Sequence, residues 1–191
     1  MPDKMKIFGN FSKMNDNKEH LLIKFKAGHL NIDELWKSGS LSASFLSSFW
    51  GTFFPSSDKV SKAEIKDSVR YIAGELIGNA VKFSSEPNFL IKISLGMSDN
   101  ELQFHVTNSI RQKDASEYQN YIQKLLKGDP DELYLEQMEE NALEDSEQSR
   151  MGFLTMILDY GAELAWEFEE GEDSKVMAAT TMVRLPIVRN L

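Results

Sequence analysis

A stretch with the spacing of an amphipathic helix, between positions 61 and 84, constrains the fold more than any other feature of the sequence. Ser61-Lys-Ala-Glu64 has the pattern of a capping box, which predicts that a helix begins at this serine and ends near Ser84. At 3.6 residues per turn, Glu75, Asn79 and Lys82 fall within a narrow arc of that helix. An apolar stripe lies roughly a quarter-turn away and comprises Ile65, Val69, Ile72, Leu76 and Phe83. We therefore expect the three polar side chains at the edge of the hydrophobic core.

The spacing leaves two interpretations of this polar stripe open. A carboxylate, an amide oxygen and an ammonium suit a magnesium–nucleotide site, because they supply a general base, a metal ligand and a cation. The same residue types also form solvated helix faces that carry one weak ion pair. The pattern locates a candidate site beside the core without deciding between these two roles.

Length and composition indicate one soluble globular domain over residues 1–191. Of these residues, 41% are hydrophobic and 27% are charged, which is enough for a substantial core. No apolar run approaches the roughly 18 residues that a membrane span requires, and residues 1–7 lack the apolar region of a secretory signal. The lack of cysteine excludes disulfides, zinc–thiolate sites and cysteine catalysis. We therefore expect a cytoplasmic protein with no membrane partner.

The formal net charge of −9 comes from one segment. Residues 129–148 contain nine acidic side chains and no lysine or arginine, while the rest of the chain carries 21 acidic and 21 basic residues. Nucleic-acid binding needs clustered basic residues, so no nucleic-acid partner is expected. The acidic segment lacks the spacing of a calcium loop. It is expected to be a solvated surface or, alternatively, to steer a basic partner or form part of a nucleotide lid. The three histidines, His20, His29 and His105, lack metal-ligand spacing, which indicates structural or solvated roles.

Periodicity predicts the other elements of the domain. Alternating residues indicate a strand at 20–26, a hairpin over 89–106 and a second hairpin over 164–185. A helix is expected over 152–160. This order predicts an α+β fold, a two-layer sandwich in which helices cover one face of a mixed, mostly antiparallel sheet.

An N-terminal region, residues 1–55, is rich in aromatic residues near its end. A helix that opens at Asn31 or Asp33 is expected to run to Phe54. The aromatic residues of this helix are Phe45, Phe49, Trp50, Phe53 and Phe54. They either pack in the core or form a surface for a homodimer or another partner, because aromatics are enriched at such contacts.

The segment 110–148 is expected to be an acidic, lid-like insert. Two weak helices are predicted in it, near 114–127 and 130–143, on either side of Gly128-Asp-Pro130. The second is polar nearly all round. Low hydrophobic burial predicts that the segment is mobile or is ordered by a partner.

The polar stripe lies in a string that resembles a known motif. Glu75-Leu-Ile-Gly-Asn79-Ala-Val-Lys82-Phe-Ser84 is similar to the N-box of the GHKL ATPase superfamily, which includes gyrases and histidine kinases. In that superfamily a helix carries Glu-x-x-x-Asn-Ala-x-Lys. The resemblance covers about residues 60–187 and implies a Bergerat-type ATPase fold that binds ATP or ADP with Mg²⁺.

Two further landmarks of the superfamily have partial matches in this chain. Asn108 holds the position of an aspartate that accepts a hydrogen bond from the adenine amine, although the glycines that follow it in the family are missing. Gly152 matches a family glycine at the start of the next helix, and Arg150 stands where another glycine is common. This arginine either contacts phosphate or blocks its approach. Thr181, beside Thr180, loosely matches a threonine on the adenine side.

The resemblance also implies roles and partners. Asn79 would give an oxygen to Mg²⁺, Lys82 would neutralise phosphate charge, and Glu75 would orient or deprotonate the attacking hydroxyl. The chain looks most like small SiaB-like and cyanobacterial superregulator proteins and anti-sigma-type kinases, because it contains Asp159-Tyr-Gly-Ala-Glu-Leu-Ala-Trp166-Glu-Phe168. Such kinases phosphorylate Ser or Thr of a small partner protein, and a phosphatase reverses the mark. Two alternatives stay open: a regulator with a degenerate pocket that only binds its partner, and a protein that uses the pocket for another ligand.

Overall fold

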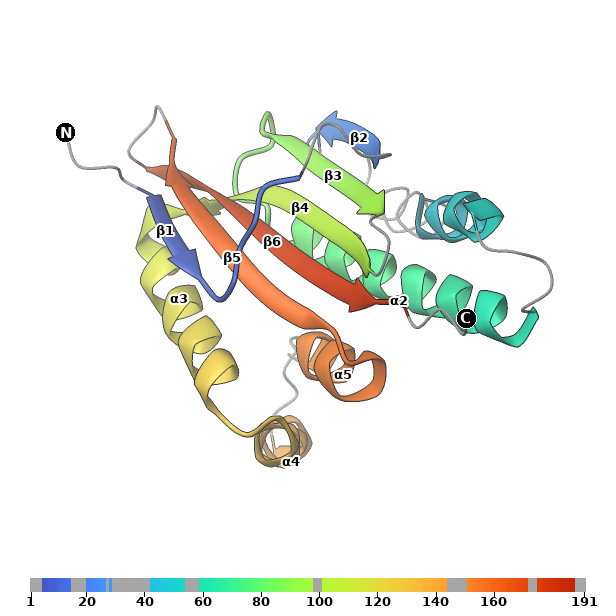
Figure 1. Ribbon diagram of the computed structural model, residues 1–191. Helices are drawn as coiled ribbons and strands as arrows, with labels where there is room; N and C mark the ends of the chain where they lie inside the picture. The colour runs from blue at the N-terminus through green and yellow to red at the C-terminus, as the bar shows by residue number, and fades with distance from the viewer. Residues whose placement is uncertain are drawn as a thin grey trace.

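The computed structural model describes residues 5–14, 20–26, 28, 42–53, 59–97, 101–143, 151–171 and 175–187. Within these residues the chain forms one six-stranded sheet, with helices packed against one of its faces (Figure 1). The predicted α+β sandwich is confirmed. Among the described strands every neighbouring pair is antiparallel, so the mixed sheet that was expected has no parallel pair there.

The strands lie in the spatial order β1-β5-β6-β4-β3-β2. Their bounds are β1 (Met5–Phe8), β2 (His20–Lys26), β3 (Leu90–Met97), β4 (Glu101–Arg111), β5 (Glu163–Glu170) and β6 (Val176–Pro186). The two hairpins predicted from alternation are β3–β4 and β5–β6. Both edge strands come from the N-terminal part of the chain, and the four-residue β1 was not predicted.

Helices cover the sheet on one side. They are α2 (Lys59–Phe83), α3 (Gln112–Lys127), α4 (Pro130–Leu143) and α5 (Met151–Tyr160), together with a helical segment over 42–50 that continues into a 3-10 turn, η2 (Gly51–Phe53). Helix α2 runs behind the centre of the sheet in Figure 1, whereas α3 and α5 lie toward the β1–β5 side. None of the described helices is long and apolar enough to cross a membrane.

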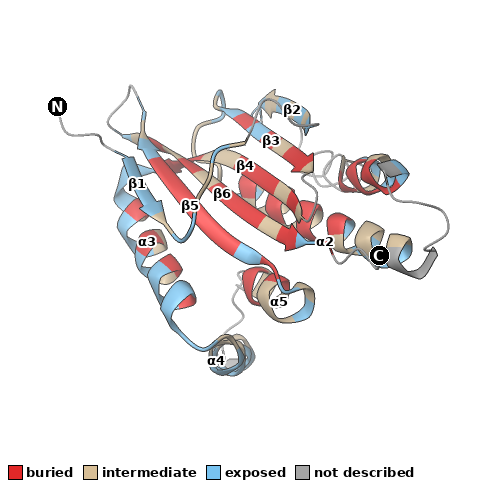
Figure 2. Cartoon of the chain, in the orientation of Figure 1, coloured by how far each residue is buried: buried red, intermediate tan, exposed pale blue. Residues whose placement is uncertain are grey.

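The core lies between α2 and the central strands. Side chains alternate across a strand, so one set of residues from β3, β4 and β5 faces the helices; Figure 2 shows it as red bands. This set comprises Ile91, Ile93, Leu95, Leu102, Phe104, Val106, Leu164, Trp166 and Phe168, all buried. From α2, Val69, Ile72 and Leu76 pack against it. The apolar stripe predicted for α2 is thus confirmed in its centre.

The ends of α2 differ from the prediction. The helix begins at Lys59, two residues before the predicted start at Ser61, and assigned helix ends commonly differ by a residue or two. Phe83, expected on the apolar stripe, is 42% exposed at the other end of the helix. Its ring lies 5.5 Å from the ammonium of Lys82. The last turn of α2 therefore extends past the core toward solvent.

A segment that we call the strap, residues 9–14, crosses the second face of the sheet (Figure 1). Gly9 turns the chain out of β1 with a φ of 74°, a left-handed conformation that favours glycine. The Ser12 carbonyl lies 2.7 Å from Nε2 of His105, and Phe11 packs edge-on against the same imidazole. Burial lowers the pKa of His105. His105 therefore has a structural role, as expected.

The strap also affects the burial of β5. Alternation predicted a strand with one buried face, but residues 164–168 are all buried, including Glu167. Lys13 of the strap reaches within 3.9 Å of the Glu167 carboxylate. Burial raises the pKa of this carboxyl, while the lysine lowers it.

The insert predicted to have low hydrophobic burial contains two helices that differ in how far they are buried. Helix α3 buries one stripe of side chains, Ala115, Gln119, Ile122 and Leu125, so the prediction is wrong for this half. Helix α4 is mostly exposed, with Leu133 and Tyr134 packed in part against the core. The two predicted helix ranges are close to the observed ones.

Only one side of the aromatic N-terminal helix packs in the core. Over residues 42–50, Ala43, Leu46 and Trp50 are buried. Phe45 is 53% exposed and stacks on Phe49, with ring centroids 6.1 Å apart. Asn31, Asp33 and Phe54 lie outside the described residues.

Candidate functional site

The polar stripe of α2 lies at the margin of the core. Glu75 and Asn79 are half-buried, while Lys82, one turn further along, is exposed. The adjacent residues Leu76 and Ala80 are buried. One end of the stripe is thus shielded from water and the other end is open to it, which suits binding of a ligand that carries charge at its solvent end.

Helix α5 meets α2 at Glu75. The carboxylate of Glu75 lies against the Cα atom of Gly152, in the first turn of α5: a Cβ atom at Gly152 would lie 3.2 Å from the carboxyl carbon and would clash with Oε2. Phe153 fixes this turn to the sheet, because its ring packs edge-on on Trp166 at 5.4 Å. Two residues that the sequence analysis assigned to separate motifs are therefore in contact.

Tyrosine side chains tie the same two helices together. Tyr71, four residues before Glu75 on α2, stacks on Tyr160 of α5 with ring centroids 5.1 Å apart and an interplanar angle of 21°. Its hydroxyl shares a hydrogen bond with Thr155. Burial raises the pKa of Tyr71, and the nearby Glu75 carboxylate acts in the same direction. Sequence analysis missed Tyr71; its position on the Glu75 stripe was the available signal.

The environment of Glu75 suits proton transfer. Burial raises the pKa of its carboxyl group, because removing water disfavours the charged form. A carboxylate with a raised pKa is a stronger base than an exposed one. Glu75 lies at the shielded end of the stripe, away from the exposed Lys82, and its carboxyl group is therefore more basic than that of an exposed glutamate.

Asn108 lies near the end of β4, where that strand is joined to the loop after α2. It is half-buried, its amide donates to the Ser109 carbonyl at 3.1 Å, and it is opposite Ala179 of β6. The next residue, Ser109, is fully buried and accepts hydrogen bonds from the backbone N–H groups of Ser85 and Glu86 at 3.1 and 2.9 Å. Ser109, which sequence analysis missed and no local pattern indicated, thus fixes Asn108 relative to the end of α2.

Thr181 is less accessible than expected for a residue that contacts adenine. It is buried and shares a hydrogen bond with the hydroxyl of Tyr118 from α3. Trp166 donates its indole N–H to the same hydroxyl at 3.1 Å. Nucleotide contact at Thr181 would need this polar cluster to open. Arg150 lies outside the described residues.

The stripe fits magnesium only in combination with phosphates. Among the described residues no group of three or more His, Cys, Asp or Glu side chains could hold a metal ion. The Asn79 amide offers one hard oxygen, and Mg²⁺ commonly takes one or two protein ligands and completes its shell with water and substrate phosphates. The residues present therefore suit Mg²⁺ that arrives with a nucleotide.

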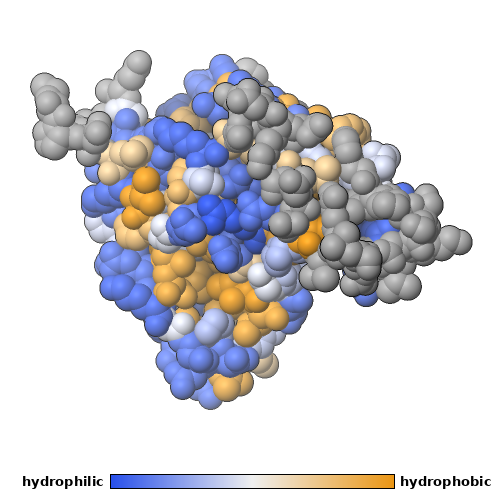
Figure 3. Space-filling view, in the orientation of Figure 1, coloured by the Kyte–Doolittle hydropathy of each residue, from blue (hydrophilic) through white to orange (hydrophobic). Residues whose placement is uncertain are grey.

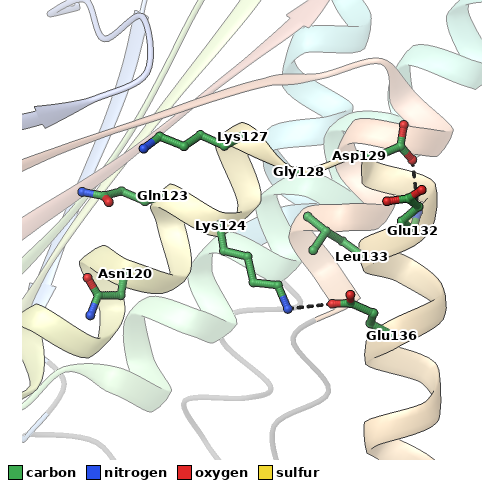
Figure 4. Close-up of a pocket in the computed structure, with 9 residues that line it drawn as sticks. All are labelled: Asn120, Gln123, Lys124, Lys127, Gly128, Asp129, Glu132, Leu133 and Glu136. Atoms are coloured by element: carbon green, nitrogen blue, oxygen red, sulfur yellow. Dashed lines mark hydrogen bonds and ion pairs between the residues drawn. The ribbon is translucent and has the colours of Figure 1, made fainter.

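A concavity lies between α3 and α4, and none of the predicted site residues lines it (Figure 4). It has a volume of about 510 Å³ and is lined by Asn120, Gln123, Lys124, Lys127, Gly128, Asp129, Glu132, Leu133 and Glu136. Lys124 and Glu136 join the two helices at 2.6 Å, and this bond raises the pKa of Lys124. The lining mixes both charges and contains no pair suited to acid–base chemistry, so it gives no candidate active site.

Comparisons with known proteins do not assign the chain to a family. The chain matches no model of a known protein family, and no curated protein is similar to it. The function proposed below is therefore supported by the residues of this chain alone.

Proposed function

We propose that the protein is an ATP- and Mg²⁺-binding regulator of the GHKL type that phosphorylates Ser or Thr of a small partner protein in a bacterial, cytoplasmic partner-switching system. The observation that carries this proposal is the contact between Glu75 and Gly152. These residues belong to two different sequence motifs of the resemblance, are far apart in the chain, and meet at the edge of the core.

We assign each residue a role that its environment supports. Asn79 offers its amide oxygen to Mg²⁺, and Lys82 reaches phosphate oxygens from the exposed end of the stripe. Bound Mg²⁺ would neutralise charge on the phosphates. Glu75 accepts the proton of the partner's hydroxyl as that oxygen forms its bond to the γ-phosphorus and ADP leaves. The N–H groups at the start of α5, beside Gly152, favour an anion.

Nucleotide binding and transfer can be tested separately with the full chain. Calorimetry with Mg·ATP and Mg·ADP should show binding, and Asn79→Ala should weaken it by at least about tenfold, since its one protein oxygen for the metal is lost. Glu75→Gln should bind Mg·ATP within about threefold of the wild type and lose phosphoryl transfer to the partner. Asn120→Ala, an exposed amide on α3, is the matched control. Wild-type behaviour of both site variants would overturn the assignment.

Two observations favour a second candidate, a regulator that binds its partner without transferring phosphate. The hydroxyl of Thr181 is already engaged with Tyr118, and the glycines expected after Asn108 are absent. Both features disfavour a fully formed adenine site. No calorimetric signal with either nucleotide, in a protein that still binds its partner, would support this candidate.

A further inference from the structure

Helix α4 presents two large apolar side chains that contribute little to the described fold. Leu135 is 62% exposed and Met138 is 51% exposed. They are three residues apart, so they lie on the same side of the helix. The contacts of α4 with the core are made instead by Leu133 and Tyr134. In Figure 3 the surface in the region of α4 is mostly hydrophilic, with apolar atoms among the polar ones.

The apolar pair is surrounded by charges of one sign. Helix α4 contains five carboxylates and no basic residue: Asp131, Glu132, Glu136, Glu139 and Glu140. Like charges four residues apart repel on a helix, and acidic groups near a C-terminus oppose the helix dipole. Lys124 of α3 offsets this at Glu136, and Gln137 donates to Glu140 at 3.2 Å. The charge pattern thus weakens α4 as an isolated element.

The charge of this face selects the class of partner. Phosphate backbones and anionic lipid head groups would be repelled by five carboxylates. A cationic segment would relieve their mutual repulsion, and apolar side chains on that segment would cover Leu135 and Met138. Helices commonly recognise one another through such anchors one turn apart, and methionine adapts its shape to the side chains it meets.

We propose that the outer face of α4, centred on Leu135 and Met138, is the docking surface for a basic amphipathic helix of a partner protein. The interface would be small, so the complex would form and dissociate readily. Its long-range attraction would come from the carboxylates, which makes association sensitive to salt. This inference does not depend on nucleotide binding.

The test uses the full chain and a designed 18-residue helix of leucine and lysine as the probe. Calorimetry should show binding that weakens as salt is raised. The double variant Leu135→Ser, Met138→Ser should weaken binding by roughly tenfold or more, because two apolar contacts are lost. The control Leu22→Ser, Leu90→Ser changes two exposed leucines on other elements and should bind as the wild type does. Circular dichroism checks that both double variants fold.

Two further measurements locate the contact. Hydrogen exchange should slow in residues 130–143 when the probe is bound, because the partner relieves the repulsion within α4. A probe of the same composition, reordered so that it has no helical face, should bind at least tenfold more weakly. Equal binding of the two probes, unchanged affinity in the α4 variant, or protection confined to other segments would each overturn the proposal.

Discussion

Helices α2 and α4 both carry carboxylates, but the structure gives these groups opposite surroundings. Glu75 of α2 is half-buried against the first turn of α5, and burial raises its pKa. The acidic residues of α4 lie on a helix that is mostly exposed. A carboxylate shielded from water can act as a base, whereas a set of exposed carboxylates acts through its field. Packing, more than residue type, separates the environments of these two sets of carboxylates.

The largest expected difference between the two helices is in stability. Ile72 of α2 is fully buried, so Ile72→Ala should lower the free energy of unfolding by about 2–5 kcal/mol. Leu135→Ala on α4 should change it by no more than about 0.5 kcal/mol, because the side chain is mostly exposed. Urea denaturation measures both. Similar losses in the two variants would mean that α4 is as much a part of the core as α2.

The next effect tests the contact between Glu75 and Gly152. Gly152→Ala should force the Glu75 carboxylate to shift, because the new methyl group would clash with it. The carboxylate ends a flexible side chain, so the loss of stability should stay at about 1–2 kcal/mol. Gly74→Ala in α2 is the matched control: its Cβ would meet only Ala43, at 4.0 Å, so the replacement should stabilise the helix by about 0.5–1 kcal/mol.

A double-mutant cycle sharpens that test. Combining Gly152→Ala with Glu75→Ala should recover part of the loss, with a coupling energy between about 0.5 and 3 kcal/mol. Strict additivity would show that the two residues do not touch in solution.

A smaller effect is expected at the start of α4. Asp129 caps this helix by accepting hydrogen bonds from the backbone N–H groups of Asp131 and Glu132 at 3.0 and 3.1 Å. Asp129→Ala should cost about 1 kcal/mol, felt mainly within α4. Hydrogen exchange should therefore quicken in residues 130–143 and stay unchanged in α2. Faster exchange across the whole chain would mean that α4 unfolds only together with the core.

The smallest effect concerns pH. The folded-state pKa of Glu75 lies above its unfolded value, so the stability linked to its proton is present at low pH and lost as the pH rises through the folded pKa. Glu75→Gln removes this loss. The variant should thus gain stability relative to the wild type as the pH rises from about 4, until Glu75 is ionised in the folded state as well. A difference that shrinks as the pH rises would mean that the carboxylate is stabilised in the folded state.

Periodic elements were predictable because their pattern is local. The strand at 20–26, the central helix and the helix that ends at Tyr160 were predicted within about two residues of their observed bounds. β1 was missed because four residues carry too little alternation, and their strand conformation depends on pairing with β5. The burial of α3 was underestimated because its overall polarity hid one narrow apolar stripe.

The positions of the candidate site residues along α2 were predictable from the sequence, but the contacts that other elements make with site residues were not. The position of Glu75 and Asn79 at the edge of the core follows from helix geometry alone. The approach of Gly152 to Glu75 depends on how α5 packs on Trp166, which no local pattern encodes. The engagement of Thr181 by Tyr118 likewise depends on where α3 lies.

The pairing of β1 with β5 bears on how the chain folds during synthesis. Met5 is opposite Glu169, so β1 can pair only after the ribosome has synthesised β5, more than 150 residues later. At typical rates of translation this delay is on the order of ten seconds. Until β5 has been made, β1 lacks its partner, and an unpaired strand of this kind invites aggregation. Closing this edge is a long-range step of the sort that slows folding, so chaperone dependence should be greatest for ribosome-bound chains that have not yet completed β5.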